Sequence, residues 1–211
     1  MRGLVAIVVT TLAAGLAVAG QGESAAAPSY STHDLQRIAD PKPALAGWSQ
    51  FEEADSYIFP IPKHAPAFTL HEWLGESPST AQKALADKLR KAGFLIGRHR
   101  VWGGRNMRPQ YGAPADAVVY AFLFRDAAGA RIGFHAFPRP PSALAAKELG
   151  PDSWGFHSQI GRGGEGAAYY WRRGNLTVLA EIVCGTDCGF PPLPSARAYA
   201  DSIDAREKRL G

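Results

Sequence analysis

The stretch AAYYWRRGNLTVLAEIVC, residues 167–184, constrains the fold of this 211-residue chain more than any other. Aromatic and β-branched residues fill both halves of the stretch, and such residues favour strands. Gly174 and Asn175 separate the halves, and both residue types tolerate the positive φ that a tight hairpin turn requires. The sequence therefore predicts two antiparallel strands joined by a two-residue turn.

Four further strands are expected. The nearly continuous apolar run AVVYAFLFR, residues 117–125, is typical of a central strand covered on both faces. FLIGRHRVW, residues 94–102, alternates loosely and indicates a second strand. RIGFHAF, residues 131–137, is predicted to pair with the central strand across the loop around Gly129. A short strand near residues 57–59 lies among prolines, which place it at a sheet edge.

Helices are predicted between and after these strands. Ser79 and Gln82 form a capping box, and Gly93 supplies the stop of that helix. A short helix is expected to begin at Ser31 or Thr32, and another to span residues 142–149. Ser195 is the expected cap of a closing amphipathic helix, whose apolar face is Ala196, Tyr199, Ala200, Ile203 and Leu210. The order of elements predicts an α+β fold, with an antiparallel sheet covered by helices in a single domain.

The N-terminus is typical of an exported protein. Arg2 precedes an apolar run over residues 4–18, and Ala17-Val18-Ala19 has the small residues that signal peptidase recognises. An uncleaved membrane anchor is the alternative, although the run is short for one. We expect a signal peptide and flexible mature N-terminus over residues 1–27, with cleavage after Ala19 or near Ala26. The domain then occupies residues 28–211 of a secreted, extracellular protein.

Export bears on the two cysteines of the chain, Cys184 and Cys188. Two thiols in an oxidising compartment tend to pair, so the sequence predicts a local disulfide at the end of the last strand. A zinc site needs four ligands, and the nearest histidine in sequence is His157. The C-x-x-x-C spacing is also one residue longer than the C-x-x-C of redox proteins. No metal and no cofactor are therefore expected.

The stretch KHAPAFTLHEW offers the one candidate hydrolytic site. His64, His71 and Glu72 would act together in a hydrolase, but the spacing is not H-E-x-x-H, and Pro66 argues against a helix there. No G-x-S-x-G nucleophile motif occurs in the chain. His99 and His135 fall in predicted strands, where a hydrogen-bonded histidine beside the core is the commoner role.

Residues 88–115 contain seven basic side chains and no acidic one. Alternation along GRHRVW places Arg98 and Arg100 on one strand face, turned toward solvent, with His99 and Val101 on the other. Arginine beside aromatic rings suits an anionic envelope polymer or an acidic protein partner. Alternatively, these arginines pair with carboxylates elsewhere in the chain. The net charge of +4 is too small to indicate a nucleic-acid partner. The candidate binding residues are Arg98, Arg100, Trp102, Arg105, Arg108 and Tyr111.

The predicted capped helix precedes the stretch FLFRDAAGA, and the predicted closing helix follows the stretch YWRRGNLTVLAEI. These stretches, in this order, resemble a known group of domains. These are the extracytoplasmic sensor-type and lipoprotein domains of high-GC Gram-positive bacteria, which have a PsbP-like fold. The similar pattern covers about residues 48–209. The resemblance implies a non-enzymatic ligand-binding or sensing module facing the cell wall. The chain departs from the kinase-linked members, which have a transmembrane helix and two disulfides, and from the lipoproteins, which have a lipid-modified cysteine.

The sequence thus predicts a secreted, non-enzymatic domain that binds a ligand or partner outside the cell. A secreted hydrolase acting through His64, His71 and Glu72 is the first alternative. A structural component of the cell envelope is the second.

Overall fold

The computed structural model describes residues 27–41, 67–75, 77–103, 115–160, 164–184 and 190–211. The strands are β1 Ala67–Phe68, β2 Phe94–Gly103, β3 Ala115–Phe124, β4 Leu144–Ala145, β5 Ser153–Ile160, β6 Gly164–Arg173 and β7 Leu176–Cys184. The α-helices are α1 Thr32–Ala39, α2 Leu70–Leu74, α3 Thr80–Lys91, α4 Ala127–Ala136 and α5 Pro192–Leu210, and a 3₁₀ helix spans Lys147–Leu149.

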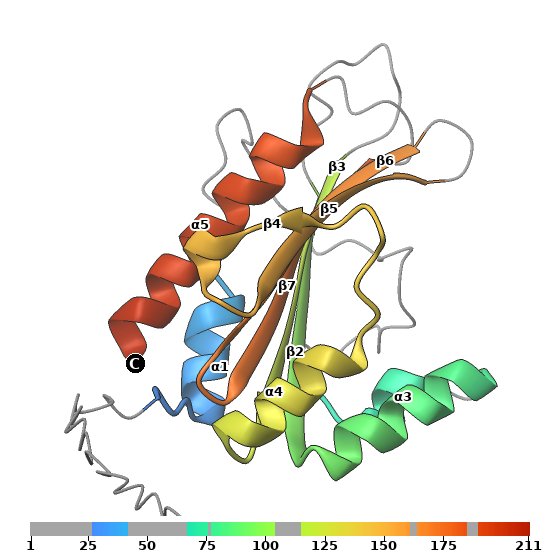
Figure 1. Ribbon diagram of the computed structural model, residues 1–211, viewed down its shortest axis with the longest axis vertical. Helices are drawn as coiled ribbons and strands as arrows, with labels where there is room; N and C mark the ends of the chain where they lie inside the picture. The colour runs from blue at the N-terminus through green and yellow to red at the C-terminus, as the bar shows by residue number, and fades with distance from the viewer. Residues whose placement is uncertain (1–26, 42–66, 76, 104–114, 161–163, 185–189) are drawn as a thin grey trace, which may run out of the picture.

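The strands form a single antiparallel sheet in the order β1-β2-β3-β7-β6-β5-β4 (Figure 1). The two apolar runs of the sequence, β3 and β7, pair in the middle of the sheet, with Val119 opposite Ala180. A continuous apolar run suits this position because both faces of a central strand are covered. The predicted α+β class with an antiparallel sheet and helices is confirmed.

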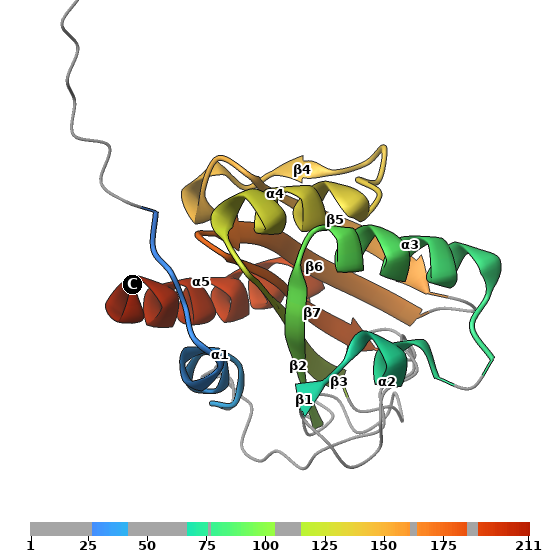
Figure 2. The same cartoon turned by 90° about the horizontal axis from the view of Figure 1, so that it is seen from below.

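Helices cover both faces of the sheet, with α1 and α5 on one face and α2, α3 and α4 on the other (Figure 2). Alternate residues of β3 supply the two cores. Ala117, Val119, Ala121 and Leu123 belong to the core under α1 and α5. Val118, Tyr120, Phe122 and Phe124 belong to the core beneath α2, α3 and α4.

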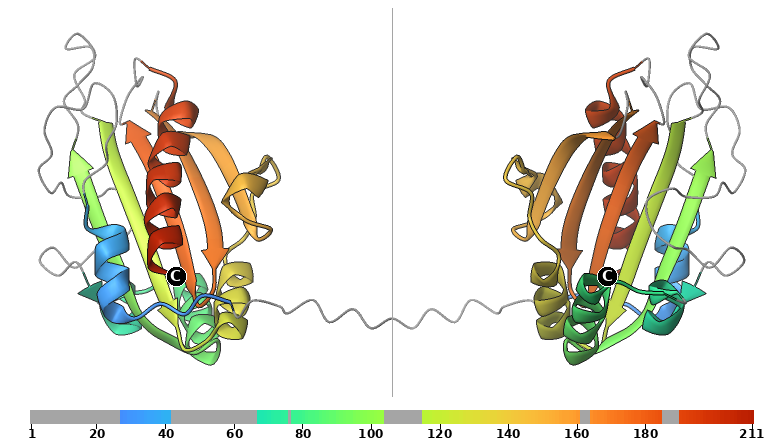
Figure 3. Two further views of the ribbon diagram at one scale, coloured as in Figure 1. Left: turned by 90° about the vertical axis from the view of Figure 1, so that its left-hand side faces the viewer. Right: turned by 90° about the vertical axis from the view of Figure 1, so that its right-hand side faces the viewer.

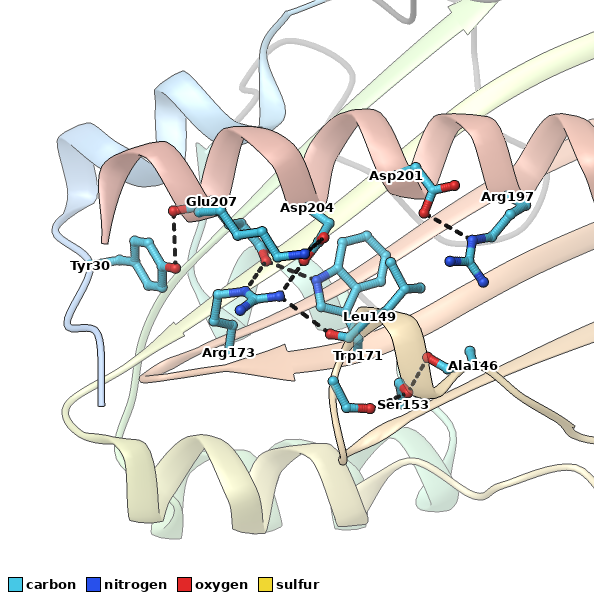
Figure 4. Close-up of polar contacts among 12 residues, drawn as sticks. Tyr30, Ala146, Leu149, Ser153, Trp171, Arg173, Arg197, Asp201, Asp204 and Glu207 are labelled. Atoms are coloured by element: carbon cyan, nitrogen blue, oxygen red, sulfur yellow. Dashed lines mark hydrogen bonds and ion pairs between the residues drawn. The ribbon is translucent and has the colours of Figure 1, made fainter. Parts of the chain in front are cut away.

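A buried polar cluster fastens α5 to the sheet (Figure 4). The indole N–H of Trp171 donates to Oε2 of Glu207 across 2.9 Å, and Nε of Arg173 lies 3.3 Å from the same oxygen. Arg173 also forms an ion pair with Asp204. Burial raises the pKa of Glu207 to about 7, although the Trp171 and Arg173 contacts act in the opposite direction. These contacts explain why charged residues lie on the inner face of α5.

The hairpin between β6 and β7 follows the prediction, but its two turn residues act differently. Gly174 has a φ of 54°, whereas no non-glycine residue of the described chain has a positive φ. Asn175 uses its side chain instead. Its Oδ1 accepts from the backbone N–H of Tyr30 at 2.7 Å, and its Nδ2 donates to the backbone oxygens of Tyr30 and Phe124, each at 3.0 Å. The turn therefore holds the N-terminal segment against the sheet.

The strand predicted for residues 131–137 is wrong, because these residues belong to helix α4. Asp126 begins this helix, and its side chain accepts from the N–H of Gly129 at 2.7 Å. An aspartate side chain that accepts from the backbone N–H three residues later is typical of a helix N-cap. The segment predicted to be a hairpin loop is therefore the N-terminal end of helix α4. A Cβ at Gly129 would lie 2.1 Å from the carbonyl oxygen of Ala92, so glycine permits the close approach of α4 to the end of α3.

The other predicted helix boundaries agree in part. Ser79 with Gln82 forms the capping box of α3, and Ser31 with Asp34 forms that of α1. The closing helix begins at Pro192, three residues before its predicted cap, and the Ser195 hydroxyl bonds the oxygen of Pro191. The helix predicted for residues 142–149 is wrong, because this segment contains β4 and the 3₁₀ helix. The predicted strand near residues 57–59 lies outside the described residues.

Candidate ligand-binding site

The face of the sheet that carries α2, α3 and α4 also holds a pocket of about 320 Å³. Such a volume lies at the lower end of the range for small-molecule sites. The strands β3, β7, β6 and β5 form its floor, and α2, α3 and the segment after α4 form its walls. The lining side chains are Trp73, Leu85, Tyr120, Phe122, Phe137, Pro138, Pro140, Trp154, Phe156, Tyr170 and Leu179.

Strand register creates the floor. Tyr120 of β3 pairs with Leu179 of β7, Leu179 pairs with Tyr170 of β6, and Tyr170 pairs with Trp154 of β5. The four side chains therefore form one continuous row across the sheet. In the right-hand view of Figure 3, α3 and α4 lie across one end of this face of the sheet. All four residues of the row line the pocket.

Aromatic contacts hold the floor and walls in place. Tyr170 stacks on Phe134 of α4 with ring centroids 4.7 Å apart. Its ring also meets Trp154 at 5.3 Å and Phe137 at 5.4 Å, both edge-on. Such aromatic pairs add to the energy of burial and fix the orientation of each ring. The pocket is therefore formed by side chains that already pack on one another.

A buried carboxyl group lies beside the aromatic row. Glu181 of β7 pairs with Val118 on one side and Ala168 on the other, and Ala168 pairs with Phe156 of the pocket. Glu181 thus occupies the row next to Tyr120, Leu179 and Tyr170. It is 5% exposed, and no hydrogen bond or ion pair joins it to another described residue. Burial alone raises the pKa of Glu181 to about 8.

Two more buried polar side chains lie on the same face. Asp116 of β3 precedes Val118 by two residues, and its Oδ1 makes no hydrogen bond within the described part of the chain. Burial raises the pKa of Asp116 to about 6. His99 of β2 packs on the ring of Tyr120 at 4.5 Å, and burial, followed by the nearby Arg100, lowers the pKa of His99 to about 3. At neutral pH His99 is therefore uncharged.

The described lining of the pocket is almost entirely apolar. Such a lining removes an apolar ligand from water. Across the described ranges, no three His, Cys, Asp or Glu side chains come together in a group that could hold a metal ion. The described helices also include none long and apolar enough to span a membrane.

The predicted basic site lies on the opposite face. Arg98, Arg100 and Trp102 pair with Ala121, Val119 and Ala117, whose side chains face α1 and α5. The predicted alternation with His99 and Val101 is thus confirmed. The expectation that Arg98 points to solvent is wrong: its side chain is 12% exposed, and its Nε and Nη2 both bind the Asp40 carboxylate.

The other predicted basic-site residues are placed in part. The guanidinium of Arg100 lies over the ring of Trp102, 4.8 Å from its centroid. Arg105, Arg108 and Tyr111 lie outside the described residues. Of the predicted binding residues, Arg98 thus pairs with Asp40 and Arg100 packs on Trp102. The binding role of the six predicted residues stays a prediction.

The candidate hydrolytic residues do not come together as a described site. Glu72 caps α2, where its Oε2 accepts from the N–H of Thr69 at 2.6 Å, and this bond lowers the pKa of Glu72. His71 is exposed on the same helix, and His64 lies outside the described residues. Pro66 does not prevent the helix, because α2 starts at Leu70. His135, expected in a strand, belongs to α4.

The predicted disulfide involves the end of β7. Cys184 closes this strand, and no cysteine in the described ranges is free. Cys188 lies outside those ranges, so its pairing with Cys184 stays a prediction. The predicted signal peptide also falls on residues that the structure does not describe.

Sequence reasoning missed the pocket, although one signal was present. Glu181 is the only charged residue in LTVLAEIVC, a strand that is otherwise buried nearly throughout. A charged side chain is almost never buried without a partner, so an acid in a central strand marks a special position. The walls could not be found this way, because they come from segments far apart in the sequence.

Comparison with known proteins gives little further guidance. No family model matches the sequence, and no characterised protein matches it in sequence either. Among solved structures, the extracellular domain of PknH from Mycobacterium tuberculosis is similar over 86% of this chain and 93% of that chain. The identity is 10% and the TM-score is 0.46, so the likeness is weak and assigns neither a family nor a function.

Proposed function

We propose that this chain is an extracellular, non-enzymatic binding domain whose pocket holds a small, largely apolar ligand. The observation that carries the proposal is the 320 Å³ pocket with seven aromatic side chains among its lining residues. Aromatic rings offer much contact area for little conformational entropy, because each has only two side-chain torsions. The packing of these rings on one another reduces the cost of ordering them when a ligand binds.

The lining also favours binding over catalysis. The titratable side chains among its described residues are Tyr120 and Tyr170, and burial raises the pKa of Tyr170 far above the physiological range. A general acid or base works best with a pKa near the operating pH. The neighbouring Glu181 has such a pKa, but no nucleophile of the described chain is paired with it. Holding a ligand is therefore the role that these residues support.

The extracellular part of the proposal rests on the predicted signal peptide and on the predicted pairing of Cys184 with Cys188. Export through the Sec route would leave a mature chain that begins after Ala19 or near Ala26, with no titratable thiol in the folded state. Two reactive thiols, or an intact Met1 in the secreted material, would contradict it. These measurements are independent of the pocket.

Binding is tested with N-phenyl-1-naphthylamine, a neutral apolar probe whose fluorescence rises when it leaves water. Leu85 lines the pocket from α3, and Leu85→Trp would place a larger side chain in that wall. Leu95→Trp is the matched control, since Leu95 is 52% exposed and is not part of the lining. We expect saturable binding by the native protein and by Leu95→Trp, and at least tenfold weaker binding by Leu85→Trp.

Equal probe affinity in the two tryptophan variants would contradict the proposal, as would the absence of saturable binding by the native protein. Thermal unfolding of each variant serves as the fold control. A Leu85→Trp protein that unfolds cooperatively near the native temperature and still binds the probe normally would place the binding elsewhere.

A further inference from the structure

We propose that the ligand of this pocket is an amphiphile with an apolar body and one protonated amine, and that Glu181 binds the amine. This inference rests on the proposed binding function and adds the chemical class of the ligand. Its starting point is a carboxyl group that is buried, has no partner within the described chain, and lies next to an apolar pocket.

The register places Glu181 within reach of the pocket. Residues directly opposite in an antiparallel pair have Cβ atoms about 5 Å apart, and residues two apart on one strand are separated by about 7 Å. Glu181 is two residues from Leu179 of the lining, and Ala168 alone separates it from Phe156 in the cross-strand row. Alanine has no atoms beyond Cβ, so no bulky β6 side chain stands between the carboxyl group and the pocket.

The energetics favour a cationic partner. An ionised carboxylate in a dry environment is costly unless a positive charge or hydrogen bonds compensate for the lost water. Glu181 has no such compensation within the described part of the chain, since burial is the sole cause of its raised pKa. An ammonium group arriving with a ligand would supply it. Aromatic faces also attract ammonium groups, and the register places Tyr120, Tyr170 and Phe156 of the lining near Glu181.

The surrounding charges favour a cation over an anion. Asp116 is a second carboxyl group on this face, at the diagonal position from Glu181, and His99 is neutral beyond Tyr120. The side chains that α2, α3 and the segment after α4 contribute to the lining are Trp73, Leu85, Phe137, Pro138 and Pro140, which do not titrate. Among the described residues that line the pocket there is no lysine or arginine. Arg139 lines an adjoining cavity of about 310 Å³ instead.

The test compares three probes of the same size in isothermal titration: 4-phenylbutylamine, 4-phenylbutanol and 4-phenylbutyrate. Native protein at pH 7.5 should bind the amine at least tenfold more tightly than the alcohol, and the carboxylate most weakly. Glu181→Gln keeps the shape of the side chain without its charge. It should bring the amine affinity within about twofold of the alcohol affinity, and the alcohol should still bind saturably.

Glu165→Gln is the matched control, because it removes a carboxylate from the opposite face of the sheet. Glu165 pairs with Cys184 of β7 and lies 3.4 Å from the His157 side chain, with 31% of its own side chain exposed. The amine preference of this variant should equal that of the native protein.

Proton release gives a second measurement that needs no variant. At pH 7 the free protein holds most of the Glu181 carboxyl groups protonated, since their pKa is about 8. An ammonium group that pairs with the carboxylate must displace this proton. Titrations in two buffers of different ionisation enthalpy should show release of close to one proton per bound amine, and none per bound alcohol.

Each result decides between the two proposals. Alcohol binding without an amine preference, or amine binding without proton release, would overturn the amine assignment and leave the apolar pocket function intact. Failure of all three probes to bind would overturn both. An amine preference that survives Glu181→Gln would overturn the role of Glu181.

Discussion

Trp171 of β6 donates its indole N–H to Oε2 of Glu207 of α5 across 2.9 Å, and both side chains are fully buried. This contact joins the sheet to the helix that covers one of its faces. It also explains how a glutamate can occupy a core position, because the indole and Arg173 together compensate for part of the lost water.

Replacing Trp171 by phenylalanine should therefore destabilise the fold through a lost hydrogen bond as well as lost volume. We expect the free energy of unfolding at pH 8, where most Glu207 carboxyl groups are ionised, to fall by about 2 kcal/mol or more, since the donor then serves a charged group. The loss should be smaller in a Glu207→Gln background, which removes the carboxylate. Urea denaturation of the four proteins of this double-mutant cycle measures the coupling, and additive losses would contradict the assignment.

Asn175 should matter more than a turn residue ordinarily does. Asn175→Ala removes the partners of the Tyr30 N–H and of the Tyr30 and Phe124 carbonyls, all in a buried setting. We expect a loss of about 2–4 kcal/mol, because unsatisfied buried groups cost about 1–3 kcal/mol each. Hydrogen exchange at Tyr30 should accelerate at the same time.

Gln36→Ala is the control for Asn175→Ala, since it deletes an exposed amide from α1. It should change stability by no more than about 0.5 kcal/mol. Unchanged protection of the Tyr30 amide in Asn175→Ala would show that the turn does not hold the N-terminal segment.

Glu181 should make stability depend on pH in a defined direction. Burial raises its pKa from 4.5 to about 8, so between these values the native state binds more protons than the unfolded state. The free energy of unfolding must then fall as pH rises from 4.5 to 8, with no further effect above 8. Glu181→Gln removes this term, so the variant should gain stability relative to native protein as pH rises, within a limit of about 5 kcal/mol.

Thermal or urea unfolding at pH 5 and pH 8 measures the effect. Asp116 and Glu207, whose pKa values are also raised, shift stability with the same sign, but both are present in the two proteins and cancel in the difference. Parallel stability curves for native protein and Glu181→Gln would contradict the raised pKa.

The central strands and several helix starts were predictable from sequence because their signals are local. Aromatic and β-branched runs marked β3, β6 and β7, and the Ser79–Gln82 pair marked α3. Helix α4 was not predicted, because Asp126 followed by small residues resembles a loop until its capping contact with Gly129 is seen. The pocket depends on the cross-strand register and on the positions of α2, α3 and the segment after α4. The sequence pattern alone predicts neither.

The contact of Arg98 with Asp40 corrects the prediction that Arg98 points to solvent, and the sequence pattern could not predict this contact. Arg98 lies in a stretch without acidic residues, yet its partner Asp40 is 58 positions away in the chain. Arg98→Ala should therefore lower stability by about 2 kcal/mol, and exchanging the two residues, Arg98→Asp with Asp40→Arg, should recover part of the loss. Chemical denaturation measures both.

Binding to an anionic polymer remains a prediction for Arg105 and Arg108. Reversing both to glutamate should release the protein from a carboxylate resin at lower salt, whereas the Arg98–Asp40 exchange should not. If the two variants elute at the same salt concentration, Arg105 and Arg108 have no role in binding the anionic polymer.

The most direct test of the proposed pocket is the position of a bound neutral probe relative to the tryptophans of the two sheet faces. Trp73 and Trp154 line the pocket, whereas Trp102 and Trp171 pack on the core under α1 and α5. Intermolecular nuclear Overhauser effects with 4-phenylbutanol should connect the phenyl protons to the indoles of Trp73 and Trp154. Contacts to Trp102 or Trp171 instead, or no contact to any indole at saturating probe, would contradict the pocket as the binding site.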